Sequence, residues 1–266
     1  MKRRLIFTLL YEDGYFVLSR NFRTQRVGNL GWLQKNYDFS KVASYLDELV
    51  IINVSNNPST LEQFTETVRA VAEGCFAPIT AGGGICSESD AHSLFRHGAD
   101  KVLINRALYE DHRLVEALAG RYGRQAIVGS LDFKKQVDGY TLVSHRATRP
   151  QPWGPVEQIL NSGMVGEIYA TSVLQDGTGQ GMDSEIVEEL RSRVRSLVPV
   201  VLAGGAGKPE HLLEPLQNPA VSGVATANLL NFIGDGLKRT RQSFRDAGID
   251  LARWDVTESD SKPSRS

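Results

Sequence analysis

The sequence runs AGGGICSESDAHSLFRHGADKVLIN over residues 81–105 and, beginning 122 positions later, AGGAGKPEHLLEPLQNPAVSGVATAN over residues 203–228. Each stretch leaves an apolar segment through a glycine cluster and passes along an amphipathic segment into a second apolar segment. This order predicts a strand, a tight turn, a helix and the next strand. Because the offset is close to half of the chain, the two copies predict a fold with an internal half-repeat.

Short apolar segments recur along the whole chain, with amphipathic segments between them. The predicted strands cover residues 5–10, 49–54, 77–81, 101–104, 126–131, 167–172, 199–203 and 221–227, and the predicted helices cover 61–73, 87–97, 114–122, 155–162, 184–195 and 210–216. Strands that are apolar on both faces are typical of parallel sheets covered by helices. Eight such units predict an α/β protein with a single (β/α)8 TIM barrel over residues 1–256, built as two half-barrels, because an open doubly wound sheet has fewer strands. Residues 257–266 are polar and predict a disordered tail.

Composition limits the classes of partner. The 266 residues carry 30 Lys and Arg against 31 Asp and Glu, so a net charge of −1 predicts neither a nucleic-acid partner nor an anionic membrane surface. The basic start meets Glu12 after a short apolar run, which predicts a strand and no signal peptide, and no apolar stretch reaches the ~18 residues of a membrane span. Cys75 and Cys86 have no metal-type spacing, so we expect a cytoplasmic protein without a metal or cofactor.

The glycine clusters predict phosphate binding. Without Cβ atoms their backbone amides can approach a ligand closely at the start of a helix, although one such cluster alone is more often a tight turn. Two copies at half-barrel spacing favour a small-molecule substrate with a phosphate at each end. The candidate phosphate-binding residues are Gly82, Gly83, Gly84, Asn105, Asp176, Gly177, Thr178, Gly204, Gly205, Ala227 and Asn228.

Asp132 is the candidate catalytic residue. It ends the apolar run of IVGSLDFKK and so lies at the carboxyl end of a barrel strand, where catalytic groups of this fold are found. The alternative is a carboxylate that caps a turn or pairs with Lys134 or Lys135. Elsewhere, Lys238, Arg241 and Arg245 recur at three-and-four spacing, which predicts a solvated helix face.

Five motifs resemble the cyclase subunit of imidazole glycerol phosphate synthase over nearly the whole chain. They are GGGI at 82–85, ADKVLIN at 99–105, QAIVGSLDFKK at 125–135, GEIYATSVLQDGT at 166–178 and AGGAGK at 203–208. The resemblance implies a barrel that receives ammonia from a separate glutaminase subunit. It also implies a ribulosyl-formimino-aminoimidazole nucleotide held by its two phosphates on the glycine loops, which the family cleaves while it closes an imidazole ring.

One catalytic residue of that family is missing here. The family uses two aspartates on opposite strands, of which Asp132 matches one, whereas Leu10 in TLLYEDG stands at the place of the other. Leu18 likewise replaces a lysine that usually follows the Asp-Gly turn. Leucine transfers no proton, and a positioned acid or base contributes roughly 10²–10⁴ in rate. We therefore expect weak ring closure unless Glu12 or Asp13 substitutes.

The opposite end of the barrel matches the family fully. The resemblance implies that Arg4, Glu48, Lys101 and Glu167 form a charged ring that gates ammonia at the strand-start face, where the glutaminase docks near Asp100. A plug of salt bridges that only stabilises the barrel is the alternative.

The leucine and the stretch NFRTQRVGN at 21–29 resemble a paralogue group that is found with surface-polysaccharide genes and associated with sugar amidation. The resulting expectation is a glutamine amidotransferase subunit that receives ammonia for sugar amidation. The alternatives are a histidine-biosynthesis cyclase that uses Glu12 or Asp13, a noncatalytic scaffold that activates a glutaminase, and a sugar isomerase of the related half-barrel family, which needs both aspartates and is disfavoured by Leu10.

Overall fold

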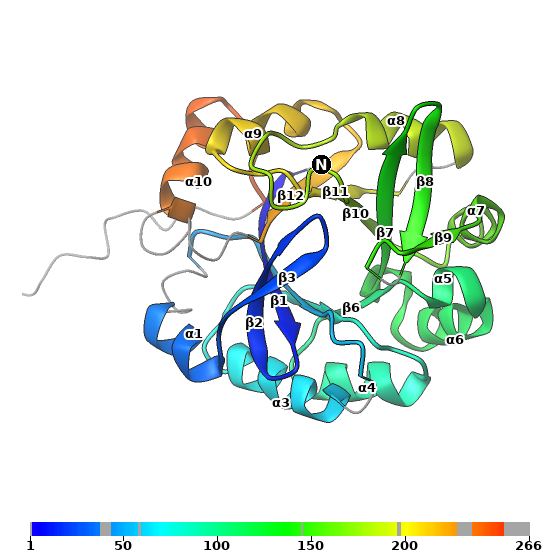
Figure 1. Cartoon of the computed structure of the whole chain (residues 1–266), viewed down its shortest axis with the longest axis horizontal. Coiled ribbons are helices and arrows are strands. Elements are labelled where there is room, and N and C mark those ends of the chain that lie inside the picture. The colour runs from blue at the N-terminus through cyan, green and yellow to red at the C-terminus, as the bar shows by residue number, and fades with distance from the viewer. Residues whose placement is uncertain are drawn as a thin grey trace, which may run out of the picture.

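Eight parallel strands close into a barrel with helices around the outside (Figure 1). The computed structural model describes residues 2–37, 44–57, 60–144, 146–195, 198–227 and 236–252. In barrel order the strands are β1 (Arg4–Glu12), β4 (Glu48–Asn53), β5 (Ile79–Gly82), β6 (Lys101–Ile104), β7 (Ile127–Gln136), β10 (Glu167–Ser172), β11 (Val200–Ala203) and β12 (Val221–Thr226). Pairing of β7 with β10 and of β12 with β1 completes the ring. The predicted (β/α)8 barrel is confirmed.

Helices lie in each of the six segments with predicted helical periodicity. They are α3 (Leu61–Ala72), α4 (Glu88–Arg96), α6 (His112–Tyr122), α7 (Trp153–Asn161), α8 (Glu185–Arg193) and α9 (Pro209–Leu213). The described residues also form α1 (Leu30–Asn36), α5 (Ala107–Glu110), α10 (Gly236–Asp246) and the 3₁₀ turns η2 (Arg124–Ala126) and η3 (Glu214–Gln217). Side-chain caps fix several starts: Ser87 accepts the Asp90 N–H before α4, and Asp111 accepts the Leu114 N–H before α6. None of the helices in the described residues is long and apolar enough to cross a membrane.

Two antiparallel extensions rise from the carboxyl ends of barrel strands. β2 (Tyr15–Arg20) and β3 (Arg23–Gly28) form a hairpin on the end of β1, and β8 (Gly139–Ser144) and β9 (Arg149–Gln151) extend β7 in the same way (Figure 1). The two-residue turn into β2 holds Asp13 and Gly14 at φ values of 48° and 89°, which is the left-handed conformation that an Asp-Gly hairpin turn requires. The eight-strand pattern did not predict these extensions, which surround the mouth of the barrel.

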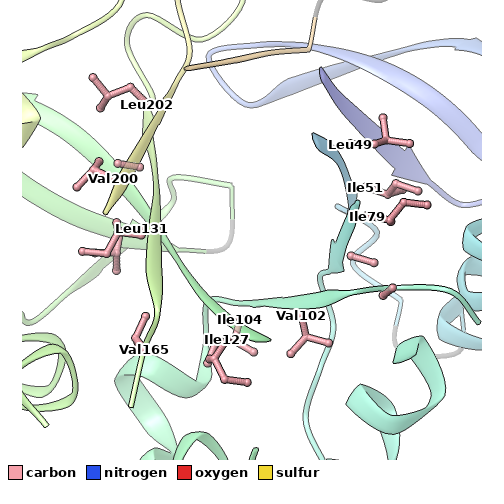
Figure 2. Packing of buried hydrophobic residues seen from close by; sticks show 14 of the residues in the cluster. Leu49, Ile51, Ile79, Val102, Ile104, Ile127, Leu131, Val165, Val200 and Leu202 are labelled. Carbon is pink, nitrogen blue, oxygen red and sulfur yellow. The ribbon is translucent and has the colours of Figure 1, made fainter. Parts of the chain in front are cut away.

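The hydrophobic core has two layers because side chains alternate along each strand. Residues that point outward pack beneath the helices, and Figure 2 shows ten of them by name, among them Leu49 and Ile51 on β4 and Leu202 on β11. Residues that point inward fill the barrel itself. This smaller cluster contains Ile6, Val50, Leu103, Val128, Tyr169, Val201, Ala203 and Ala225.

The prediction of a solvated face on α10 is wrong for Arg241. Lys238 and Arg245 are exposed, but Arg241 is only 2% exposed, and its guanidinium donates to Asp47 at 2.9 Å. The Asp47 carboxylate also accepts the Leu5 N–H at 2.8 Å. The helix buries the stripe that contains Arg241 against the barrel, so this guanidinium anchors α10 at the start of β4. Residues 257–266, the predicted tail, lie outside the described residues.

Replacing Arg241 by Met should destabilise the protein by about 3–5 kcal/mol, because Asp47 would keep a buried charge without its partner. Urea unfolding at neutral pH measures this loss. Arg239→Met changes an exposed arginine of the same helix and should leave the free energy of unfolding within about 0.5 kcal/mol. Equal losses in the two variants would refute the anchoring role of the buried pair.

Candidate functional site

Strand alternation lines the barrel axis with successive layers of side chains. On β1 the inward positions are Arg4, Ile6, Thr8 and Leu10. Three other strands also start with a charged residue, and their next inward positions are Val50, Leu103 and Tyr169 in the central cluster. Polar residues such as Asp132 and Thr171 line the cavity at the strand ends. The axis therefore has a charged bottom, an apolar centre and a polar mouth.

The bottom layer is a closed ring of four ion pairs. Each member is the first residue of its strand: Arg4 on β1, Glu48 on β4, Lys101 on β6 and Glu167 on β10. Arg4 and Glu48 approach to 2.5 Å, Lys101 lies 3.1 Å from Glu48 and 3.2 Å from Glu167, and the pair of Arg4 with Glu167 closes the ring. The structure thus brings together all four residues that the resemblance placed there.

Two hydroxyl groups complete the ring. Thr80 donates to Glu48 at 2.5 Å, and Ser222 lies 3.0 Å from Glu167. Burial alone would raise the pKa of Glu167, but the hydrogen bond and charge of Arg4, together with Lys101, lower it below its usual value. Directly above the ring, the Tyr169 and Thr8 hydroxyls are hydrogen-bonded at 2.8 Å across the apolar centre.

A cavity of about 820 Å³ opens at the mouth. It is lined by ten of the predicted site residues: Gly83, Gly84, Asn105, Asp132, Asp176, Gly177, Thr178, Gly204, Gly205 and Ala227. Gly82 is not among the described residues that line it, and Asn228 lies outside the described residues. Hydroxyl and amide side chains, such as those of Ser55, Ser144 and Thr171, also line the cavity. Its volume fits a small-molecule ligand.

The glycine loops at the mouth match in geometry at their central glycine. Gly83 and Gly205 have φ values of 96° and 99°, and a Cβ at either would overlap a carbonyl oxygen, of Asn53 in one copy and of Gly181 in the other. The tight turns considered for these clusters are therefore present in both half-barrels. The same backbone also lines the cavity, which is compatible with phosphate binding. Phosphate binding by these loops stays a prediction.

Asp132 lies on β7 at the wall of the cavity. The Asn105 amide donates to its carboxylate at 3.3 Å and to the Ser130 carbonyl at 2.9 Å. Burial and the negative charge of Asp176 raise the pKa of Asp132 to about 7, against the smaller opposing effect of the Asn105 hydrogen bond. Lys135, one of the two lysines considered as a partner, pairs with Glu185 instead. Asp132 is thus placed to exchange a proton near neutral pH.

The wall opposite Asp132 is apolar. Leu10 lines the cavity from β1, four strands around the ring from β7. Neither Glu12 nor Asp13 is among the described residues that line it. The Glu12 carboxylate is paired with Arg146 and accepts the Thr24 hydroxyl at 2.8 Å, and these contacts lower its pKa although burial opposes them. Of the two substitute acids proposed from the sequence, Glu12 is therefore already engaged by Arg146 and Thr24.

Asp176 holds the β2–β3 hairpin over the mouth. Its carboxylate accepts the Ser19 hydroxyl at 2.5 Å and the Phe22 N–H at 3.0 Å, while the Asn21 amide donates to the carbonyls of Val173 and Leu174. These contacts link segments more than 150 positions apart, so no local pattern could have predicted them. The side chain expected to help bind a phosphate is instead occupied by the hairpin.

Within the described part of the chain, no three His, Cys, Asp or Glu side chains gather in a way that could hold a metal ion. Cys75 and Cys86 form no disulfide with each other; Cys75 is buried and Cys86 is exposed at the cavity.

Comparison with known proteins assigns the family. Residues 28–234 match the family described as "Histidine biosynthesis protein". A protein named "Imidazole glycerol phosphate synthase subunit HisF" from Chlorobium limicola (strain DSM 245 / NBRC 103803 / 6330) is 35% identical over 251 residues, which are 94% of this chain and 98% of the relative. This chain belongs to the HisF family.

Two further relatives of this HisF-family chain span its length. "Putative imidazole glycerol phosphate synthase subunit hisF2" from Parasynechococcus marenigrum (strain WH8102) is 41% identical over 263 residues, covering 98% of this chain and 97% of the relative. The HisF subunit of Chlorobaculum tepidum (strain ATCC 49652 / DSM 12025 / NBRC 103806 / TLS) is 33% identical over 253 residues, covering 94% and 98%. The resemblance found in the sequence motifs is confirmed at the level of the family.

Replacing Asp132 by Asn should stabilise the protein at alkaline pH. Folding raises the pKa of this carboxyl from about 3.8 to about 7, so its ionisation costs native stability progressively as pH rises through that interval. The variant should match the wild type near pH 4 and exceed it by about 1–3 kcal/mol above pH 7, with the full shift discounted for partial exposure. Urea unfolding at several pH values measures the difference. A constant difference across the range would contradict the raised pKa.

Replacing Asp176 by Ala should release the hairpin, because Ser19 and Phe22 would lose their shared acceptor. Limited trypsin digestion should then cut after Arg20 or Arg23 about tenfold faster, as expected for the loss of about 1.4 kcal/mol of local stability. Asp183→Ala, which removes the acceptor of the Tyr140 hydroxyl elsewhere, is the control. Unchanged cleavage in Asp176→Ala would show that other contacts hold the hairpin.

Proposed function

We propose that this HisF-family protein is the ammonia-receiving subunit of a two-protein glutamine amidotransferase. The observation that carries the proposal is the contrast between the two ends of the barrel. The ring of Arg4, Glu48, Lys101 and Glu167 is complete, whereas Leu10 stands where ring closure needs a second proton-transferring group. Ammonia delivery is retained and the chemistry at the mouth has changed.

The partner would be a glutaminase that docks at the strand-start face, around the ring and Asp100. The Asp100 carboxylate accepts the Ile79 N–H at 2.8 Å and so binds the backbone at the start of β5. Buried charges are costly unless paired, and all four ring members satisfy one another, so a small rearrangement on docking would open a path without leaving any charge unpaired. Ammonia would then pass the Tyr169 and Thr8 hydroxyls, which can donate to it and accept from it.

The ligand at the mouth would be a phosphorylated small molecule. The paired glycine loops support this part of the proposal, because their backbone faces the cavity in both half-barrels. The finer assignment, amidation of a sugar for surface-polysaccharide biosynthesis in the cytoplasm, rests on the resemblance to the paralogue group. Hydroxyl and amide side chains along the cavity suit a polyhydroxylated ligand.

Product formation tests the proposal. The purified protein is given ribulosyl-formimino-aminoimidazole nucleotide and excess ammonium salt, beside Leu10→Asp and its uncharged match Leu10→Asn. Wild type and Leu10→Asn should form no detectable imidazole glycerol phosphate, and Leu10→Asp should form it at about 10²-fold above the assay background, the lower range for a positioned acid or base. Calorimetry reports binding of the same nucleotide.

Imidazole glycerol phosphate from the wild type would overturn the proposal in favour of a histidine-biosynthesis cyclase. If the nucleotide and sugar phosphates all fail to bind, the noncatalytic scaffold that activates a glutaminase becomes the better account. Binding without turnover supports an ammonia-receiving barrel that serves another reaction.

A further inference from the structure

An arginine from the turn after β8 reaches across the mouth. Arg146 is ion-paired with Glu12 at the end of β1 and donates to the Val54 carbonyl at 2.9 Å. Its guanidinium therefore connects the β8–β9 extension of β7 with the carboxyl ends of β1 and β4. Arg146 lines the cavity, whereas its partner Glu12 is not among the described residues that do.

The ion pair lies on the apolar wall. Glu12 follows Leu10 by two positions on β1, so both side chains leave the same face of that strand, with Glu12 nearer to solvent. The guanidinium is thus the half of the pair that faces the ligand space, next to the position where the family acid is lost.

The pair leaves the buried Nε–H of Arg146 without a partner in the described part of the chain. Nη2 makes the contacts to Glu12 and Val54, while the Nε–H is buried and has no hydrogen-bond partner among the described residues. A buried unpaired donor costs about 1–3 kcal/mol. Arg146 and Ala147 also adopt φ values of 57° and 63°, a conformation that is uncommon for non-glycine residues. The Nε–H is a donor that an added oxyanion could satisfy.

The remaining arginines that line the cavity differ from Arg146. Arg20 and Arg23 are exposed on the hairpin, and Arg106 contacts the Cys86 sulfur and pairs with Glu110 on the surface. Arg146 alone among these four combines a carboxylate partner at the end of β1 with a buried donor that lacks a partner among the described residues.

We propose that Arg146 binds an oxyanion of the ligand, and that Glu12 is an internal competitor that holds the guanidinium when the cavity is empty. The Nε and Nη2 donors form the edge that grips a phosphate or carboxylate with two parallel hydrogen bonds. The ligand class is a sugar phosphate whose second charged group, a phosphate or a carboxylate, reaches the wall above Leu10. This inference deepens the proposed phosphorylated ligand and rests on it.

The competitor arrangement predicts opposite effects for the two members of the pair. Arg146→Gln should weaken anion binding about tenfold or more, since charged hydrogen bonds contribute at least that factor. Glu12→Gln should strengthen it several-fold, because the guanidinium no longer has to leave a carboxylate. Lys135→Gln removes the same charge from an exposed pair with Glu185 and controls for net charge.

Calorimetric titration of the full chain with two matched probes, glucose 1-phosphate and glucuronic acid 1-phosphate, tests this. If the carboxylate is the group that Arg146 binds, the wild type prefers the glucuronic acid probe and Arg146→Gln erases the preference. If it is the phosphate, Arg146→Gln weakens both probes equally. In either case Glu12→Gln must act in the opposite direction and Lys135→Gln must stay at the wild-type value.

Effects of the same sign in Arg146→Gln and Glu12→Gln, or no effect in Arg146→Gln, would overturn the inference and leave a structural tie. Failure of glucose 1-phosphate alone to bind would count against the phosphate loops while the Arg146-dependent binding of the carboxylate probe still supports the inference. Binding of neither probe would overturn both proposals.

Discussion

In a closed barrel of eight parallel strands, every second side chain of each strand must point to one narrow axis without solvent. Charged groups can occupy such an axis only where they neutralise one another, and Arg4, Glu48, Lys101 and Glu167 do so at the strand starts. The aliphatic layer above them excludes water and strengthens these pairs. The ring thus closes the bottom of the barrel electrostatically while remaining a set of charges that a docked partner could rearrange.

At the mouth, the same alternation of side chains along the strands places Asp132 and Leu10 toward the cavity. The two residues face the cavity from opposite strands, so a carboxyl with a pKa of about 7 lies across the cavity from a leucine. One group that is half protonated near neutral pH can donate or accept a proton, but it cannot do both within one step as an opposed pair can. The site therefore offers Asp132 for proton exchange, while Leu10 stands where the family resemblance implies a second aspartate.

Two sets of polar contacts connect the antiparallel extensions to other segments at the mouth. Asp176 holds the hairpin on one side, and Arg146 reaches Glu12 on the other. Both links use charged groups next to the ligand space, so each can respond to what the cavity contains. A second charge near Asp132 also matters energetically, because Asp176 contributes to the raised pKa of that carboxyl. Asp176 thus both holds the hairpin and affects the protonation of Asp132.

Local patterns in the sequence determined the eight strands, the six helices and the two glycine turns, because hydrophobic periodicity and glycine conformation act over a few residues. The ring residues and the lost aspartate were found through the family resemblance, and the geometry then brought the ring together. Tertiary structure alone decided that Arg241 is buried, that Asp176 serves the hairpin, and that Arg146 meets Glu12. These partners are 134 to 194 positions apart, so closure of the barrel, and no local preference, places them in contact.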